Sequence, residues 1–118
     1  MTTNGKAEPR VELADLTAAT FEKYTDKAFE VEVDNVKQAV TLVDCTEKPD
    51  NMGPDSTRTP FTLMLRAEVD DENPLQHAHS FLCTLRGLEE GEISNLSVER
   101  IMRPPRLPGG VYFQVVFG

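Results

Sequence analysis

Two histidines, His77 and His79, are the pair of residues that most resembles part of a metal site. In an extended segment, side chains two residues apart point to the same face, so both imidazole rings would reach one ion. A zinc or similar site needs further ligands at short spacing, and the sequence shows no third ligand near this pair. The two histidines also open a predicted strand, after a loop that contains proline. We therefore predict no metal and keep both residues as weak candidates.

Other catalytic motifs are missing from the sequence. It has no G-x-S-x-G elbow, no Walker loop, no dinucleotide-binding glycine pattern and no H-E-x-x-H motif. The two cysteines, Cys45 and Cys83, lie in strand-like segments and are predicted to be buried free thiols. A disulfide between them requires neighbouring strands. The sequence thus predicts no catalytic residue and no cofactor, which favours a protein that is not an enzyme.

Charge is the next source of candidate residues. The chain has 20 acidic and 12 basic residues, a net charge of −8, and such a surface repels the phosphates of nucleic acid. Acidic residues gather in two loops, whereas the chain from residue 100 onward carries three arginines and no acid. Solvated loops explain these charges, and so does the docking of a protein partner. The partner-binding candidates are Asp70, Asp71, Glu72, Glu89, Glu90, Glu92, Arg103 and Arg106.

The elements that position these residues are predicted from alternating apolar and polar residues, which are typical of strands with one buried side. The alternation covers residues 29–33, 61–69, 80–86 and 111–117. Two further strands are predicted at 36–46 and 93–102. The predicted core comprises Phe29, Val31, Val40, Leu42, Phe61, Leu63, Leu65, Phe81, Leu85, Val98, Phe113, Val115 and Phe117. This pattern predicts an architecture and names no chemistry.

Six strands at this spacing predict an all-β fold, a small six-stranded antiparallel barrel or barrel-like sandwich with one short N-terminal helix. Asp15 or Thr17 is the expected N-cap of that helix, whose apolar side should plug an end or cover an edge of the sheet. The strand at 36–46 has apolar residues on both faces and is expected to be covered on both. In the strand at 93–102, Leu96 and Val98 share one face but Ile101 falls on the other. A bulge near Glu99 or Arg100 would bring Ile101 to the same face.

The length of 118 residues fits one domain. We expect a flexible tail at residues 1–12 and a single β domain at 13–118. Residues 47–60 form the longest predicted loop, which is either functional or a site of tolerated variation. The sequence shows no secretory signal peptide and no apolar run that would span a membrane. These features predict a cytoplasmic protein.

Several motifs occur in a recognisable order: LTAATFEKYTDKAFEV, VTLVDC, RTPFTLMLRAE, PLQHAHSFLCTLRGLEEGEISNLSVERI and the terminal VYFQVVFG. Over roughly residues 13–118 this order resembles a family of short bacterial all-β proteins of unknown function. We associate that family with genes near phage-tail-collar-type proteins. The resemblance implies a role in assembling or decorating a phage-like or adhesive particle, and it implies no catalytic residue.

These observations favour a non-enzymatic protein-interaction or assembly module that is part of a phage-like particle or accessory to one. One alternative is an acidic inhibitor that mimics nucleic acid and occupies a basic cleft of a target protein. A less favoured alternative is a metal-dependent enzyme centred on His77 and His79. The expected partner is a protein rather than nucleic acid or a membrane, and a homo-oligomer is a further option. The expected location is the cytoplasm or a phage-like particle.

Overall fold

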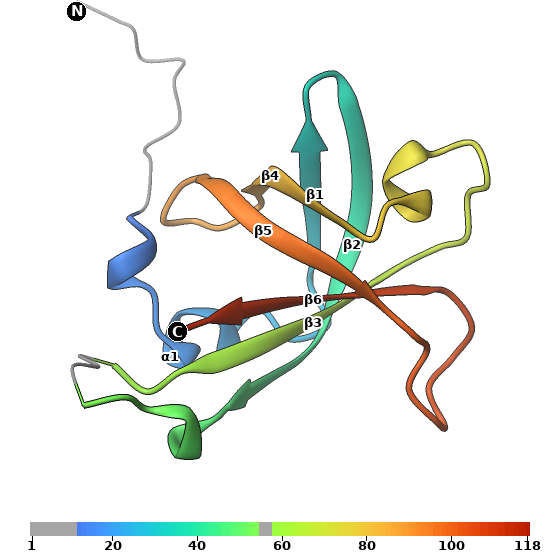
Figure 1. The fold of residues 1–118 in the computed structure, drawn as a ribbon. Helices are drawn as coiled ribbons and strands as arrows, with labels where there is room; N and C mark the ends of the chain where they lie inside the picture. Colours follow the sequence, from blue (N-terminus) through green and yellow to red (C-terminus); the bar gives the residue numbers. More distant parts are fainter. Residues whose placement is uncertain (1–11, 55–57) are drawn as a thin grey trace, which may run out of the picture.

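Six antiparallel strands close into a barrel in the computed structural model (Figure 1), which describes residues 12–54 and 58–118. The strands follow one another around the barrel in the order β1-β2-β3-β6-β5-β4, and β4 pairs again with β1. The predicted all-β fold is confirmed, and it takes the form of a closed barrel. The strands are β1 (Ala28–Val33), β2 (Val36–Glu47), β3 (Phe61–Ala67), β4 (Ser80–Arg86), β5 (Ile93–Ile101) and β6 (Val111–Phe117).

The core fills the inside of the barrel with alternate side chains from every strand. All but one of the predicted core residues are buried. The exception, Phe81, is half-buried and meets Phe113 edge to face, with ring centroids 5.8 Å apart. Val69 was expected on the buried side of its strand, but β3 ends at Ala67 and Val69 is 63% exposed. Period-two alternation therefore identifies the inward side of each strand and not where the strand ends.

A short N-terminal segment closes one end of the barrel, as predicted. It comprises the 3-10 helix η1 (Leu13–Asp15) and the helix α1 (Ala18–Glu22). Thr17 is the N-cap of α1, and its N–H donates to Oγ1 of Thr20 at 3.2 Å. Phe21 is fully buried against the rings of Phe61 and Phe117, at centroid distances of 5.8 and 5.6 Å. A helix this short is not stable alone, so its apolar side chains hold it in place.

The opposite end of the barrel is closed by the 3-10 helix η3 (Pro74–His77). Its buried residues are Leu75 and Gln76. Nε2 of Gln76 donates to Oε1 of Gln38 at 2.8 Å and to the carbonyl of Glu68 at 2.7 Å, while its Oε1 accepts the N–H of Asp70 at 2.8 Å. The buried amide thus has partners on both its donor and its acceptor side, as burial of a polar group requires.

Two β-bulges correct the predictions of which side chains of β2 and β5 point inward. In β2 the pairing with β3 shifts between Leu42 and Asp44, so Val43 is an extra residue. The bulge, rather than a cover on both faces, explains the apolar residues on either side of that strand. In β5 the extra residue lies opposite the Cys83–Leu85 stretch of β4, and Asn95 has a φ of 58°. The bulge predicted near Glu99 or Arg100 was therefore placed too late in the strand.

Most of the predicted tail, residues 1–11, lies outside the described residues, as do residues 55–57 of the long loop. The described part of that loop contains a second 3-10 helix, η2 (Pro49–Asn51). No helix in the described ranges is long and apolar enough to cross a membrane.

Candidate functional site

The two histidines lie beside η3 rather than in one strand. His77 is the last residue of η3, and its Nε2 lies 2.7 Å from the carbonyl oxygen of Asp71. His79 follows two residues later, just before β4. Because η3 is helical, the extended geometry that would bring the two rings to one face does not apply at His77. Within residues 12–54 and 58–118, no three His, Cys, Asp or Glu side chains group as ligands for a metal ion.

The two acidic loops lie at opposite ends of the barrel. Residues 70–72 precede η3, which leads into the start of β4, whereas residues 89–92 follow the end of β4 (Figure 1). The N–H of Glu72 donates to Oδ1 of Asp70 at 3.1 Å, so the first loop is shaped by its own acid. The two candidate clusters therefore do not form one continuous acidic face.

The acids of the second loop are partly used inside the protein. The hydroxyl of Tyr24 donates to Glu90 at 2.7 Å, and Nζ of Lys23 lies 3.0 Å from the same carboxylate. The N–H of Glu89 donates to the Tyr24 hydroxyl at 2.8 Å. The hydrogen bond from Tyr24, followed by that from Lys23, lowers the pKa of Glu90 below its usual value. These contacts fasten α1 to the loop between β4 and β5.

Glu92, in the same loop, belongs to a separate ion-pair group. Nη1 of Arg86 lies 2.5 Å from Glu92, and its Nε lies 3.1 Å from Glu32 of β1. Hydrogen bonds to Glu32 and then to Glu92 raise the pKa of Arg86. This group joins β1 to β4 at the strand pair where the barrel closes. Its geometry supports a structural role for Glu92.

The two candidate arginines lie in the loop between β5 and β6. Nη1 of Arg103 donates to the carbonyl of Leu107 at 2.8 Å, and Arg106 has a φ of 72°. The same loop covers Tyr112, whose hydroxyl donates to the carbonyl of Pro108 at 2.7 Å and which is only 1% exposed. The side chain of Tyr112 lies on the outer side of β6. The loop between β5 and β6 therefore covers part of the outer side of this strand.

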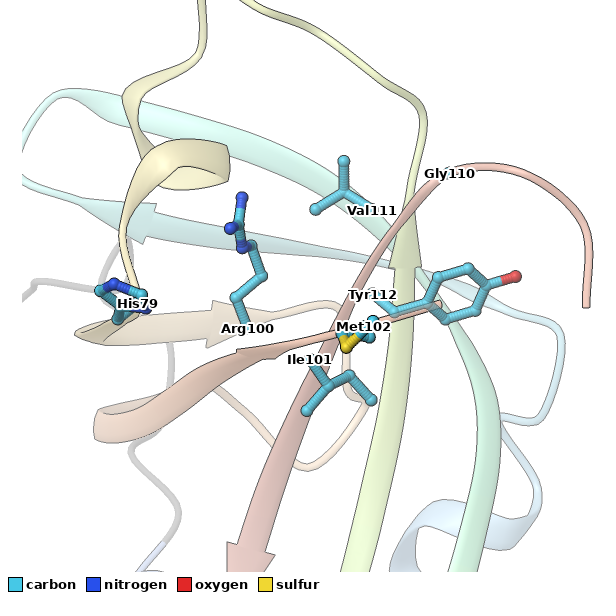
Figure 2. A pocket seen from close by; sticks show the side chains of 7 residues that line it. All are labelled: His79, Arg100, Ile101, Met102, Gly110, Val111 and Tyr112. Atoms are coloured by element: carbon cyan, nitrogen blue, oxygen red, sulfur yellow. The ribbon is translucent and has the colours of Figure 1, made fainter. Parts of the chain in front are cut away.

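A hollow of about 380 Å³ lies near this loop, beside the end of the barrel that η3 closes. Figure 2 shows Arg100, His79 and Val111 among its lining residues. Nη1 of Arg100 donates to the carbonyl of Gln76 at 2.6 Å, and its backbone N–H donates to the carbonyl of His79 at 2.8 Å. The hollow therefore combines a fixed, positively charged group with an apolar wall.

Sequence reasoning did not single out Arg100 as a site residue. A signal was present, because Arg100 has the same strand phase as the inward residues Leu96 and Val98. An arginine at the end of such a series points toward a barrel mouth instead of into the core. No comparable sequence signal indicated that Gln76 would hold Arg100 in place, because this role depends on how η3 packs against β2 in the folded barrel.

A second feature lies on the outer side of β4, β5 and β6. Strands β5 and β6 pair only over Glu99–Ile101 with Tyr112–Gln114, and they separate beyond these residues (Figure 1). Val116, on β6 past this pairing, is 63% exposed, and Leu82, opposite Ser97, is 61% exposed. A hollow of about 290 Å³ lies along this seam, lined by Ser80, Ser97, Glu99, Gln114 and Val116. We call Leu82, Val116 and these lining residues the seam surface.

Both cysteines are free thiols, as predicted, but only Cys83 is buried, whereas Cys45 is half-buried. Cys83 lies in β4 and Cys45 in β2, and β1 separates these two strands in the barrel. Burial raises the pKa of Cys83 to about 12. Burial, together with the nearby carboxylate of Glu22, raises the pKa of Cys45 to about 11. Both groups are therefore thiols rather than nucleophilic thiolates at neutral pH.

Comparison with known proteins identifies the family of the chain. Residues 16–117 match the family described as a domain of unknown function (DUF6916). Neither the comparison with curated proteins nor that with solved structures finds a match.

Proposed function

We propose that this chain, which belongs to the DUF6916 family of domains of unknown function, is a non-enzymatic protein-interaction or assembly module. The observation that carries the proposal is the seam surface. Two aliphatic side chains are more than half exposed there: Val116, which lines the hollow, and Leu82, which is paired with the lining residue Ser97. Exposed apolar side chains that flank a hollow are typical of protein-binding surfaces.

The chemistry of the seam surface supports a protein ligand. Its lining combines a short hydroxyl side chain, Ser97, with the amide of Gln114, which donates to Glu99 at 2.7 Å. Small polar groups beside exposed aliphatic groups suit a partner that buries one apolar side chain and exchanges a few hydrogen bonds. In a molecule of net charge −8, such a surface contacts a partner with little electrostatic repulsion.

The proposed setting is a phage-like particle, in which this module is a component or an accessory. The support for this setting is the resemblance to a family associated with phage-tail-collar-type genes. A small barrel whose inward side chains form the core presents its outer faces and loops to neighbours, which suits a structural part. Another copy of this chain is a second type of partner for the seam surface.

The proposal is tested by capturing partners from the native host with tagged wild-type protein and with two variants, Leu82→Glu and Val116→Glu. Proteins enriched by the wild type should be depleted about tenfold or more by either variant, since a buried unpaired charge is costly. Val69→Glu is the matched control, because Val69 is as exposed as Val116 but lies outside the seam surface. Quantitative mass spectrometry of the captured proteins provides the measurement.

Three results would separate the possibilities. Tail or baseplate proteins lost with both seam variants would support the particle setting. A wild-type oligomer that becomes monomeric with Val116→Glu, measured by light scattering, would identify a second copy as the partner. Equal capture by the wild type and all three variants, or no capture at all, would contradict the proposal.

A further inference from the structure

Arg100 differs from the other arginines of the barrel in what its guanidinium group faces. Arg66 pairs with Glu68 at 2.7 Å, and Arg86 pairs with two glutamates. In the described part of the chain, no carboxylate lies within ion-pair distance of Arg100. Its guanidinium group lines the 380 Å³ hollow instead. A positive charge at the edge of a hollow in an acidic protein is an attractive site for a negatively charged group.

The position of this guanidinium group is fixed before any ligand arrives. Its Nη1 donates to the carbonyl of Gln76 at 2.6 Å, and the side chain of Gln76 is itself held by Gln38 and Glu68. A guanidinium group carries five N–H donors, and this bond uses one of them. The remaining donors are held in a rigid fork, which reduces the entropy lost when a ligand binds.

The other walls of the hollow limit what it accepts. Val111 projects toward the same end of the barrel as Arg100 (Figure 2), and the neighbouring Met102 is 91% exposed. An aliphatic carbon therefore fits next to the charged group of the ligand. A polyanion such as nucleic acid is disfavoured by the net charge of −8. A single carboxylate carries one negative charge and matches the geometry of a guanidinium group.

We propose that this hollow binds one carboxylate of the protein partner, an inference that rests on the proposed interaction function. Arg100 binds the carboxylate, and Val111 and Met102 pack against the carbon atoms beside it. The carboxylate comes from the C-terminus of a chain or from an aspartate or glutamate side chain. These two sources share their chemistry, and different peptides distinguish them.

The direct test uses three short N-acetylated peptides with an apolar residue next to the charge. The first ends in a free carboxylate, the second has an amidated end and one internal glutamate, and the third is amidated and neutral. Binding is followed by backbone amide NMR shifts of residues 99–101 and 111–113. At least one of the two charged peptides should bind, and the neutral peptide should not. Shifts of equal size from all three peptides would overturn the inference.

Variants identify the group that binds. Arg100→Gln should weaken peptide binding about tenfold or more, because a charge-assisted hydrogen bond is lost. Met102→Glu places a negative charge at the rim and should also weaken binding, and it leaves the contact between Arg100 and Gln76 in place. Lys27→Gln, at an exposed position just before β1 and outside the hollow, is the control and should bind within about twofold of the wild type. Unchanged binding by Met102→Glu and Arg100→Gln would overturn the inference.

The same variants separate this inference from the proposed function. If Arg100→Gln and Met102→Glu capture the partner normally while Val116→Glu does not, the carboxylate site is wrong and the interaction function stands. If the wild type captures no partner but still binds a charged peptide through Arg100, the interaction function fails by itself. Thermal unfolding followed by circular dichroism shows which variants are folded, and Met102→Glu tests the site if Arg100→Gln is not.

Discussion

Arg58 fastens the N-terminal segment and the C-terminal residue to the barrel. Its Nη1 donates to the carbonyls of Leu13 and Leu16, both at 2.6 Å, and its Nε donates to the carbonyl of Gly118 at 2.9 Å. The guanidinium carbon also lies 5.7 Å from the centre of the Phe117 ring. One side chain from the long loop therefore holds the N-terminal segment and the C-terminus together. The loop that the sequence offered as functional or variable contains a structural residue.

We expect Arg58→Ala to lower the free energy of unfolding by about 2–3 kcal/mol, because three carbonyls lose a charged donor. Arg58→Lys should recover only part of this loss, since an ammonium group lacks the planar fork. Urea unfolding followed by circular dichroism measures both. Lys27→Ala, at an exposed position, is the control and should change the stability by less than about 0.5 kcal/mol. An Arg58→Ala variant as stable as this control would show that the contacts contribute nothing.

Cys45 and Cys83 give a second prediction at the scale of single residues. Their pKa values of about 11 and about 12 mean that very little thiolate is present at pH 8. We expect both thiols to react slowly with a disulfide reagent in the folded protein and rapidly in denaturant. Absorbance of the released thiol measures the rate. Rapid labelling of the folded protein at pH 8 would contradict the burial of Cys83 and the partial burial of Cys45.

The two closures of the barrel are contrasting elements. The α1 end depends on apolar contacts around Phe21, whereas the η3 end depends on the buried amide of Gln76. The helical spacing of apolar residues in the N-terminal segment predicts the first closure, because an apolar stripe on so short a helix must lie against the sheet. It does not predict the second, since the partners of Gln76 come from β2 and from the loop after β3.

Gln76→Ala should lower the free energy of unfolding by about 2–3 kcal/mol, because it leaves Gln38 and the Glu68 carbonyl without a donor in a buried place. Combining it with Gln38→Ala in a double-mutant cycle should give a coupling of about 0.5–1.5 kcal/mol. Chemical unfolding of the four proteins measures the cycle. Gln114→Ala, at a half-buried outer position, is the control and should cost less. Strictly additive effects would show that the two amides do not depend on each other.

The contact between α1 and the loop after β4 gives a pH prediction. The pKa of Glu90 is lowered in the folded protein by Tyr24 and Lys23. The unfolded state therefore binds the proton more readily, so the stabilisation is present above the unfolded pKa and is lost as the pH falls through the folded pKa. We expect Glu90→Gln to lower the melting temperature at pH 7 and to lower it less near pH 3. An equal difference at both pH values would contradict the role of the charge.

The sequence predicted most of the strands because one side of each is buried, and the bounds of β4 and β6 were correct. Errors occurred where a residue departs from the strand pattern. Val43 is inserted into β2, and Asn95 adopts a left-handed φ in β5. Neither valine nor asparagine requires a bulge, so the position of each bulge depends on the pairing with the neighbouring strand. The Arg100 hollow was missed for a related reason: its walls come from β5, β6, the loop between them and His79, which meet only in the folded barrel.

At the scale of the whole molecule, the distribution of charge distinguishes the interaction module from a nucleic-acid mimic. A mimic presents a continuous row of negative charges, but here the acidic loops lie at opposite ends of the barrel. Glu90 and Glu92 in one of them are also paired with Lys23 and Arg86. A contact made through the seam surface, which contains one acidic residue, Glu99, would therefore depend little on these loops.

We accordingly expect the affinity for the captured partner to fall less than about threefold between 50 and 300 mM salt, since apolar contacts are hardly screened and one carboxylate pair is screened only modestly. Surface plasmon resonance over this range measures the dependence. A triple variant, Asp70→Asn with Asp71→Asn and Glu72→Gln, should bind like the wild type. A fall of a hundredfold or more, together with weak binding by the triple variant, would instead favour an acidic inhibitor of a basic cleft. The two outcomes require different surfaces of the same barrel, so this titration decides which surface faces the partner.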